Sequence, residues 1–422
     1  MPPMEGVGTP AKKKKKGSGL LGRIIRRFFL VLFTVVILAV AALILVMNMV
    51  FNGPSPAARD VLTMSLSEAS ATKWVPALFI GEDTVAEIRT SVNAELEEDV
   101  TDTTKVIIQA NNVITGDSNE WDKYPDGVRF EEYAGDTYNA HIMIVRDPAQ
   151  VYMGTSTEKY STAIPGKRIT EMMEANPDAI AAVNAGAFFD DGTTSSTVGS
   201  TPLGLVMSNG NCVWTSGKQP GLEGFAGFNE DNILVVSKTN LTQSQAAEMN
   251  IRDGCCFGPV LIMNGEVNLE AYNNKSGFNP RTAIGQRSDG AVIFVCIDGR
   301  QAGSLGGTYA DIINIMQAYG AVNACNMDGG SSSVMMYRDT EGRFGTAGEV
   351  VMVNNYSLLQ SQPRRMPNFW MVRKASYGGV IREKYRQFRY GRSGFGSGHG
   401  HIQTGAQGEA LLLQRSGPGV GL

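Results

Sequence analysis

Apolar and polar positions follow two distinct patterns along the chain. The first is a single long apolar run, Phe28–Phe51, which contains no charged residue. An apolar helix of about 20 residues spans a bilayer, whereas the apolar core of a cleaved signal peptide has only about 7–15 residues. No clean Ala-x-Ala cleavage site follows the run. The pattern therefore predicts an uncleaved transmembrane helix at residues 28–51.

The charges around this helix predict its orientation. Residues 1–27 carry eight Lys or Arg and one Glu, and basic residues that flank a membrane helix stay on the cytoplasmic side. We therefore expect a cytoplasmic tail at residues 1–27 and a single-pass protein of the cell membrane, with its main domain extracytoplasmic. Residues 52–100 mix apolar and acidic positions in a way that suits helices, and we expect them to form a helical stalk.

From residue 101 to residue 374, the second pattern consists of short apolar runs separated by Gly, Asn and Asp. Such runs predict strands. They are His141–Val145, Ala179–Ala185, Asn232–Val236, Ala291–Ile297, Ala321–Met327 and Glu349–Val353. Two stretches have helical spacing, Ile169–Ala175 and Tyr309–Tyr319, and Thr308 with Asp311 forms a capping box for the second. The expected fold is a mixed α+β domain dominated by sheet.

Two acidic residues follow predicted strands on either side of one helix. Asp298 follows the strand at 291–297 and Asp328 follows the strand at 321–327, each before a Gly. The two strands and the helix form a βαβ-like unit, so both strand ends are expected at one edge of the sheet, where ligands gather in α/β folds. Paired carboxylates suit acid/base work on a glycosidic bond, or metal binding. The alternative is that each Asp-Gly pair only makes a turn.

Glycine, serine and arginine near these two positions suit the binding of a phosphate. Helix starts and glycine-rich turns offer N–H groups to an anion, and arginine offers a planar fork. The candidates are Arg281, Arg300, Gly307, Thr308, Gly329, Gly330, Ser331 and Ser332. Helix caps, turns and surface ion pairs use the same residue types, so this alternative stays open.

A further stretch, Ala182–Asp191, offers groups that suit a sugar. Asn184 ends a predicted strand, Gly186 lies in the turn that follows, and Phe188 and Phe189 come next. An amide can hydrogen-bond sugar hydroxyls, and an aromatic ring can stack on a sugar. Core packing is the alternative for the two rings, and it is the expectation for one of them.

Composition excludes several other kinds of site. The chain has three His and five Cys, with no CxxC motif, so a Ser-His-Asp triad, a Cys-His dyad or a zinc site has almost no material. Residues 28–372 carry 21 basic and 38 acidic residues, a charge of −17, which argues against nucleic-acid binding by the body. Residues 375–422 are basic and Gly-rich, and are expected to be disordered.

Read in order, the motifs NAGAFF, PLG, NPRTAIG, DGR, GGTYAD and NMDGGSSS resemble the phosphodiester glycosidase domain family, over roughly Asp126–Lys374. The most specific parts are Arg281–Gly285 and Asp328–Ser332. The resemblance implies hydrolysis of a sugar-1-phosphodiester, which releases the sugar and leaves a phosphomonoester. Such chemistry needs a positioned carboxylate and phosphate-binding groups but no histidine.

The resemblance also implies roles for the candidate residues. Asp298 and Asp328 would supply the acid, the base or a stabilising charge, and Arg281 would act with them. Phosphate would be bound by arginine, and sugar hydroxyls by amide and hydroxyl side chains. The phosphate set is Arg281 and Arg300, and the hydroxyl set is Asn184, Ser331 and Ser332.

The sequence thus predicts a membrane-anchored, extracytoplasmic glycosidase of cell-envelope glycans or exopolysaccharide, with no cofactor, metal or nucleic-acid partner. One alternative is a non-catalytic glycan-binding or envelope-assembly protein that uses the same pocket. Another is a calcium-binding adhesion domain that uses Asp190 and Asp191, although no EF-hand pattern surrounds them.

Overall fold

A computed structural model of the chain describes residues 20–67, 72–90, 98–104, 121, 123–189, 199–216, 224–273, 276–301, 303–356 and 362–374. Most of the basic segment expected in the cytoplasm, residues 68–71 and 91–97 of the expected stalk, and the whole tail at 375–422 lie outside these residues. So do Asp190 and Asp191, on which the calcium alternative depends.

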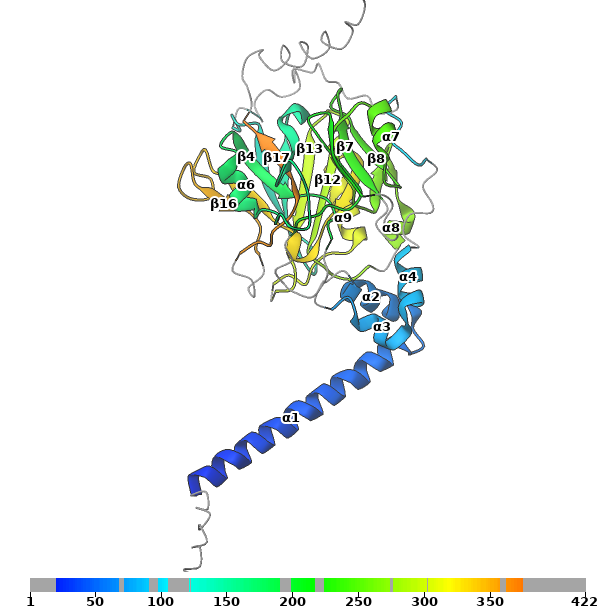
Figure 1. The fold of residues 1–422 in the computed structure, drawn as a ribbon, viewed down its shortest axis with the longest axis vertical. Coiled ribbons are helices and arrows are strands. Elements are labelled where there is room, and N and C mark those ends of the chain that lie inside the picture. The colour runs from blue at the N-terminus through cyan, green and yellow to red at the C-terminus, as the bar shows by residue number, and fades with distance from the viewer. Residues whose placement is uncertain are drawn as a thin grey trace, which may run out of the picture. The chain divides into compact units, whose positions relative to one another are not determined.

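The described part of the chain begins with helices, drawn in blue in Figure 1. The first is α1 (Leu20–Phe51), followed by α2 (Pro56–Ser67), α3 (Val75–Ile80) and α4 (Glu82–Thr90). Within the described residues, one helix, at Gly22–Phe51, is long and apolar enough to cross a membrane. A signal sequence near an N-terminus has the same properties. The ring of Phe51 stacks on that of Phe79 in α3, with 5.0 Å between the centroids, so α1 contacts the short helices at its C-terminal end.

The rest of the described chain is dominated by strands. The strands are β1 (Val128–Ala134), β2 (Asn139–Val145), β3 (Val151–Thr155), β4 (Ala179–Asn184), β5 (Leu205–Ser208), β6 (Asn211–Thr215), β7 (Phe225–Asn229), β8 (Leu234–Ser237), β9 (Ile251–Cys255), β10 (Val260–Met263), β11 (Glu266–Val267), β12 (Arg281–Arg287), β13 (Val292–Ile297), β14 (Ala321–Met327), β15 (Met335–Arg338), β16 (Val350–Met352) and β17 (Asn368–Arg373). The helices among them are α6 (Ile169–Ala175), α7 (Gln243–Glu248), α8 (Leu269–Asn273) and α9 (Tyr309–Ala318). All six predicted strands and both predicted helices are present, so the expected sheet-dominated α+β class is confirmed.

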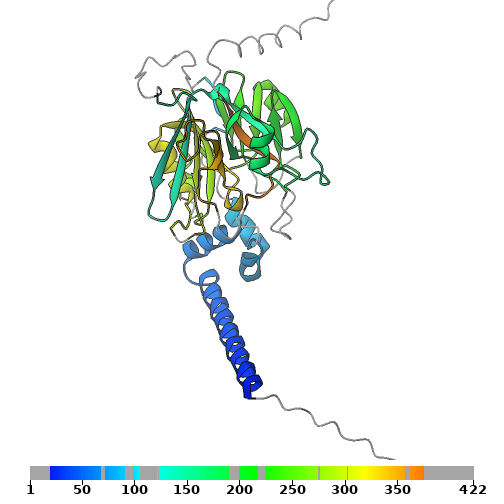
Figure 2. The ribbon, with the colours of Figure 1, turned by 90° about the vertical axis from the view of Figure 1, so that its left-hand side faces the viewer.

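The strands form three antiparallel sheets. The seven-stranded sheet has the order β1-β2-β13-β12-β14-β10-β11, and the five-stranded sheets have the orders β16-β15-β4-β17-β3 and β6-β5-β9-β7-β8. Figure 2 shows the long teal strands β1 and β2 of the seven-stranded sheet in a separate layer from the green strands of the β6-β5-β9-β7-β8 sheet. The sheets bury their apolar faces against one another, as layered domains do.

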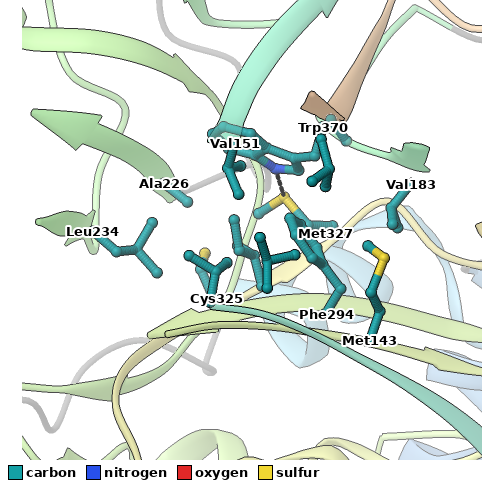
Figure 3. Close-up of a cluster of buried hydrophobic side chains, with 14 of the residues drawn as sticks. Met143, Val151, Val183, Ala226, Leu234, Phe294, Cys325, Met327 and Trp370 are labelled. Carbon is teal, nitrogen blue, oxygen red and sulfur yellow. Dashed lines mark hydrogen bonds between the residues drawn. The ribbon is translucent and has the colours of Figure 1, made fainter. Parts of the chain in front are cut away.

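One core is shared by all three sheets. In Figure 3, Met143, Phe294 and Met327 of the seven-stranded sheet face Val183 and Trp370 of the β4–β17 sheet, and side chains of β7 and β8 close the third side. The Trp370 indole N–H points to the Met327 sulfur at 3.4 Å. A second core lies on the other face of the seven-stranded sheet, where α9 packs.

The predicted βαβ-like unit is present, with one strand inserted. β12 lies between β13 and β14 and is antiparallel to both, so β13 and β14 run parallel to each other. At the start of β12, Arg281 is paired with Ile297 at the end of β13, and Thr282 with Met327 at the end of β14. The ends of β13 and β14 and the start of β12 therefore meet at one place, which we call the β12–β14 edge.

Candidate functional site

The β12–β14 edge brings Arg281, Asp298 and Asp328 together, but not on one face. Residues paired across neighbouring strands share a face. Arg281 is paired with Ile297, which belongs to the core under α9. The Asp298 carboxylate instead reaches His141, which is paired with Cys296 of the inter-sheet core. Arg281 and Asp298 therefore point to opposite faces of the sheet, because side chains alternate along a strand.

The Asp298 carboxylate is fully enclosed and holds several donors. His141 Nε2 lies 3.0 Å from Oδ2, while Asn355 donates its backbone N–H to Oδ1 at 2.9 Å and its side-chain amide to Oδ2 at 2.8 Å. The Asp298 side chain has no exposed surface, and that of His141 is only 7% exposed. Asn355 itself is exposed and covers the carboxylate. Asp298 thus joins β2, β13 and the segment after β16.

Beside this pair, Cys296 is not a reactive thiol. Burial raises its pKa well above the usual value, the nearby Asp298 charge raises it further, and a hydrogen bond with Thr282 acts weakly in the other direction. A thiol is a nucleophile only as the thiolate. Cys296 therefore packs as a neutral side chain.

Asn184 joins two sheets at this edge. Its amide oxygen accepts hydrogen bonds from the Thr282 hydroxyl at 2.8 Å and the Val334 N–H at 3.1 Å. Its amide nitrogen donates to the Asp328 carbonyl oxygen at 2.6 Å. The residue is completely buried. The side chain that the sequence suggests for a sugar hydroxyl instead fixes the position of Asp328 in this structure.

Asp328 is the more accessible of the two carboxylates. It is half-buried, and its Oδ1 accepts the Gly329 N–H at 3.0 Å. The chain then enters a single 3₁₀ turn at Gly330–Ser332, whose first residue has a φ of +62° and donates its N–H to the Pro280 carbonyl at 2.8 Å. A positive φ favours glycine, which explains that position. We call residues 328–333 the serine turn.

The serine turn contains polar side chains that are buried. The hydroxyls of Ser332 and Ser333 have no hydrogen-bond partner among the described residues, and both residues are almost fully buried. Ser331 is half-buried, and its carbonyl accepts the Tyr356 hydroxyl at 2.6 Å. Asn354 donates to the Ser333 carbonyl at 3.3 Å. Asn354, Asn355 and Tyr356 therefore connect the serine turn to Asp298.

Arg281 is engaged by the backbone on the α9 side. Its Nε donates to the Gly307 carbonyl at 3.0 Å, its Nη2 donates to the Gly277 carbonyl at 2.9 Å, and its guanidinium lies 4.1 Å from the centre of the Tyr309 ring. The side chain is buried. The charged guanidinium of Arg281 is therefore buried at this edge, and its N–H groups donate to main-chain carbonyls.

The start of α9 is capped by the protein's own side chains. Thr308 and Asp311 form the predicted capping box, in which the Thr308 N–H donates to Asp311 Oδ2 at 2.7 Å and the Thr308 hydroxyl accepts the Asp311 N–H at 3.2 Å. The Tyr309 N–H donates to the Ser276 hydroxyl at 2.9 Å. The N–H groups that the sequence suggests for a phosphate are thus used in the cap, and the Asp311 carboxylate occupies the position of an anion.

Three other candidates lie around the edge. Arg300 is exposed, has a φ of +58° and donates to the Asn279 side chain at 2.8 Å. Gly186 is packed so closely that an added Cβ would lie 2.8 Å from the Cβ of Cys255. Phe188 is 8% exposed and belongs to a core cluster, whereas Phe189 is 60% exposed. Phe188 is thus the ring that packs in the core, and Phe189 is the ring open to a ligand.

Sequence reasoning missed four residues of this site: His141, Asn355, Tyr356 and Arg364. Asn355 and Tyr356 follow the predicted strand at 349–353, so the rule that singled out Asp298, polar residues at a strand end, would have found them. Arg364 has no such signal. Its guanidinium lies 4.7 Å from the centre of the Phe188 ring, and its Nη1 donates to the Ser331 hydroxyl at 3.3 Å.

The described residues contain no group of three or more His, Cys, Asp or Glu side chains that could hold a metal ion.

Comparison with known proteins finds similarity in the part of the chain that contains this edge. A family model described as phosphodiester glycosidase matches residues 177–373. The SPbeta prophage-derived uncharacterized protein YomE of Bacillus subtilis (strain 168) is 24% identical over 192 residues. That match covers 44% of this chain and 27% of the relative, so the chain spans about a quarter of the relative's length.

The chain is also similar to solved structures, among them a glycosidase catalytic domain and an exported protein. The catalytic domain of zebrafish N-acetylglucosamine-1-phosphodiester α-N-acetylglucosaminidase, described as auto-inhibited by its pro-peptide, is 20% identical with a TM-score of 0.44, over 59% of this chain and 82% of that one. A putative exported protein of Burkholderia pseudomallei is 13% identical with a TM-score of 0.37, over 56% of this chain and 74% of that one. The family resemblance read from the motifs is confirmed by the phosphodiester glycosidase family model, which matches residues 177–373.

Proposed function

We propose that this protein hydrolyses sugar-1-phosphodiesters at the β12–β14 edge. The observation that carries the proposal is the half-buried Asp328 at the end of β14. It lies next to a turn of glycine and serine, and its backbone carbonyl accepts a hydrogen bond from Asn184. The family match over residues 177–373 supports the reaction class.

The reaction breaks the bond between C1 of the sugar and the phosphate oxygen. The oxygen of a water molecule forms the new bond to C1, and the electron pair of the broken bond stays on the phosphate oxygen, which leaves as a phosphomonoester. Asp328 accepts the proton of the attacking water and passes it to solvent. Because a phosphomonoester is a good leaving group, the reaction needs little help from a protein acid.

The other two candidates act through position and charge. Asp298 has its carboxylate engaged by His141 and Asn355, so we assign it as a positioning residue that ties β2 and β13 to the segment after β16. Arg281 has its fork on backbone carbonyls, and it contributes positive charge under the edge and fixes the loop before α9.

The test is release of free sugar from a panel of sugar-1-phosphodiesters by the full chain in detergent. Asp328→Asn keeps the size of the side chain and removes the charge, so we expect activity to fall by about 10²–10⁴, the range for loss of a positioned base. Asp289→Asn is the matched control, because Asp289 lies in the turn at the opposite end of β12 and β13 and pairs with Arg287. Equal rates for the two variants would contradict the assignment.

The test also separates the enzyme from a binding protein. Wild-type protein that releases no sugar from any substrate, but binds the same glycans, would be a non-catalytic glycan-binding module. Asp328→Asn would then weaken binding without any effect on turnover.

We further propose that α1 anchors the protein in the cell membrane with the sheet domain outside, acting on envelope glycans or exopolysaccharide. The long apolar helix and the basic residues before it support this orientation. Protease added to intact cells should remove the domain and leave a small protected N-terminal fragment. A fully protected domain would contradict the orientation.

A further inference from the structure

Two consecutive arginines before β17 have different surroundings. Arg365 makes a two-fold ion pair with Glu171 of α6, with both N–O distances 2.8 Å, and also donates to the Gly166 carbonyl at 2.8 Å. Arg364 contacts the Ser331 hydroxyl and the Phe188 ring instead. Arg365 thus fastens the segment to α6, while Arg364 reaches the serine turn.

The contact with Ser331 brings Arg364 close to Asp328. Asp328 and Ser331 both lie in the serine turn, three positions apart. Their Cα atoms are therefore at most roughly 11 Å apart, even in an extended chain. The turn is tighter than that, because the Ser332 N–H donates to the Gly329 carbonyl at 3.1 Å. A sugar phosphodiester is long enough to contact both Asp328 and Arg364.

The surroundings of Arg364 preorganise its guanidinium. The Phe188 ring lies 4.7 Å from the guanidinium carbon, and this contact restricts the rotation of the group. Phe188 is itself fixed in a core cluster. A side chain that is already ordered loses less entropy when it binds a ligand.

Tyr356 adds a neutral hydroxyl beside Arg364. Burial raises the pKa of Tyr356, although a hydrogen bond with the Arg364 backbone and the Arg364 charge act in the opposite direction. The phenol therefore keeps its proton at neutral pH and donates it to the Ser331 carbonyl at 2.6 Å. This bond holds the serine turn in place beside the arginine.

We propose that Arg364, supported by Phe188 and placed beside Ser331, binds the phosphate group of the substrate. This proposal rests on the proposed hydrolysis at Asp328. It assigns the phosphate to an arginine that contacts the serine turn, in place of Arg281, whose guanidinium donates to the carbonyls of Gly277 and Gly307. A guanidinium suits this role because its planar N–H edge matches two phosphate oxygens.

The experiment compares Arg364 with its neighbour in the full chain in detergent. For Arg364→Ala we expect KM for a sugar-1-phosphodiester to rise about 10- to 100-fold, as for the loss of a charge-assisted hydrogen bond, and inhibition by inorganic phosphate to weaken by a similar factor. Arg364→Gln keeps a donor for Ser331 and loses the charge, so we expect the same rise in KM. This variant tests the proposal if truncation to Ala impairs folding. For Arg365→Lys, which loses the bidentate ion pair with Glu171, we expect a lower Tm and an unchanged KM.

Unchanged KM and unchanged phosphate inhibition in both Arg364 variants would overturn the proposal and leave the proposed hydrolysis standing. If the wild type releases no sugar, isothermal titration calorimetry with inorganic phosphate tests the phosphate site independently of hydrolysis. Binding that is lost in Arg364→Ala but kept in Arg365→Lys supports the site without the hydrolysis. Wild-type protein that neither binds phosphate nor is inhibited by it refutes the site.

Discussion

Removal of the Asp298 carboxylate should destabilise the fold, and the contacts of Asp298 set the size of the effect. In Asp298→Ala, His141 loses its partner in a buried place, while exposed Asn355 can bind water instead. A hydrogen bond to a charged group contributes about 1.5–3 kcal/mol. At about 2–4 °C per kcal/mol for a domain of 150–250 residues, Tm should fall by roughly 3–12 °C.

Asp298→Asn should cost less, about 1 kcal/mol. Its amide oxygen can still accept the Asn355 N–H in place of Oδ1, and its amide nitrogen can donate a hydrogen bond to His141 when Nε2 acts as the acceptor. We therefore expect Asp298→Asn to melt between Asp298→Ala and the wild type.

Thermal melting of the full chain in detergent, followed by circular dichroism, measures these shifts, and Asp328→Asn is the comparison. Asp328 is half-buried, so its variant should lose less stability and more activity than the Asp298 variants. The reasoning is refuted if Asp298→Ala melts with the wild type, or if Asp328→Asn proves the less stable of the two. Either result would mean that the buried carboxylate does not hold the edge together.

Two further predictions concern stability. Asn184→Ala should lower the free energy of unfolding by about 1–3 kcal/mol in a urea titration, because it leaves the buried Val334 N–H without its acceptor; unchanged stability would show that water replaces the amide. Burial acts to raise the pKa of Asp339, but backbone N–H groups, first those of Phe344 and Arg343, lower it below the usual value. Since the folded-state pKa is depressed, its stabilisation is present above the unfolded pKa of about 3.9 and is lost as pH falls through the folded value. Asp339→Asn should therefore be less stable than the wild type at pH 7, with a gap that closes below about pH 3.9; a gap that persists at pH 2 would contradict this.

Much of the fold was already determined by local pattern. Short β-rich runs bounded by Gly and Asn gave the strands, and Thr308 with Asp311 gave the start of α9, because capping and alternation depend on residues only a few positions apart. The parallel relation of β13 and β14 also followed, since a helix that joins two strands of one sheet returns the chain in the same direction. Together these brought Asp298 and Asp328 to one edge.

The tertiary structure decided which side chains face each other there. β12 separates β13 from β14, and strand alternation directs Arg281 and Asp298 to opposite faces. No local pattern could pair Asp298 with His141, 157 positions away, or bring Arg364 to Ser331, 33 positions away. Such contacts depend on strand order and sheet packing, which are set by the burial of whole apolar faces and not by the residues that meet at the edge.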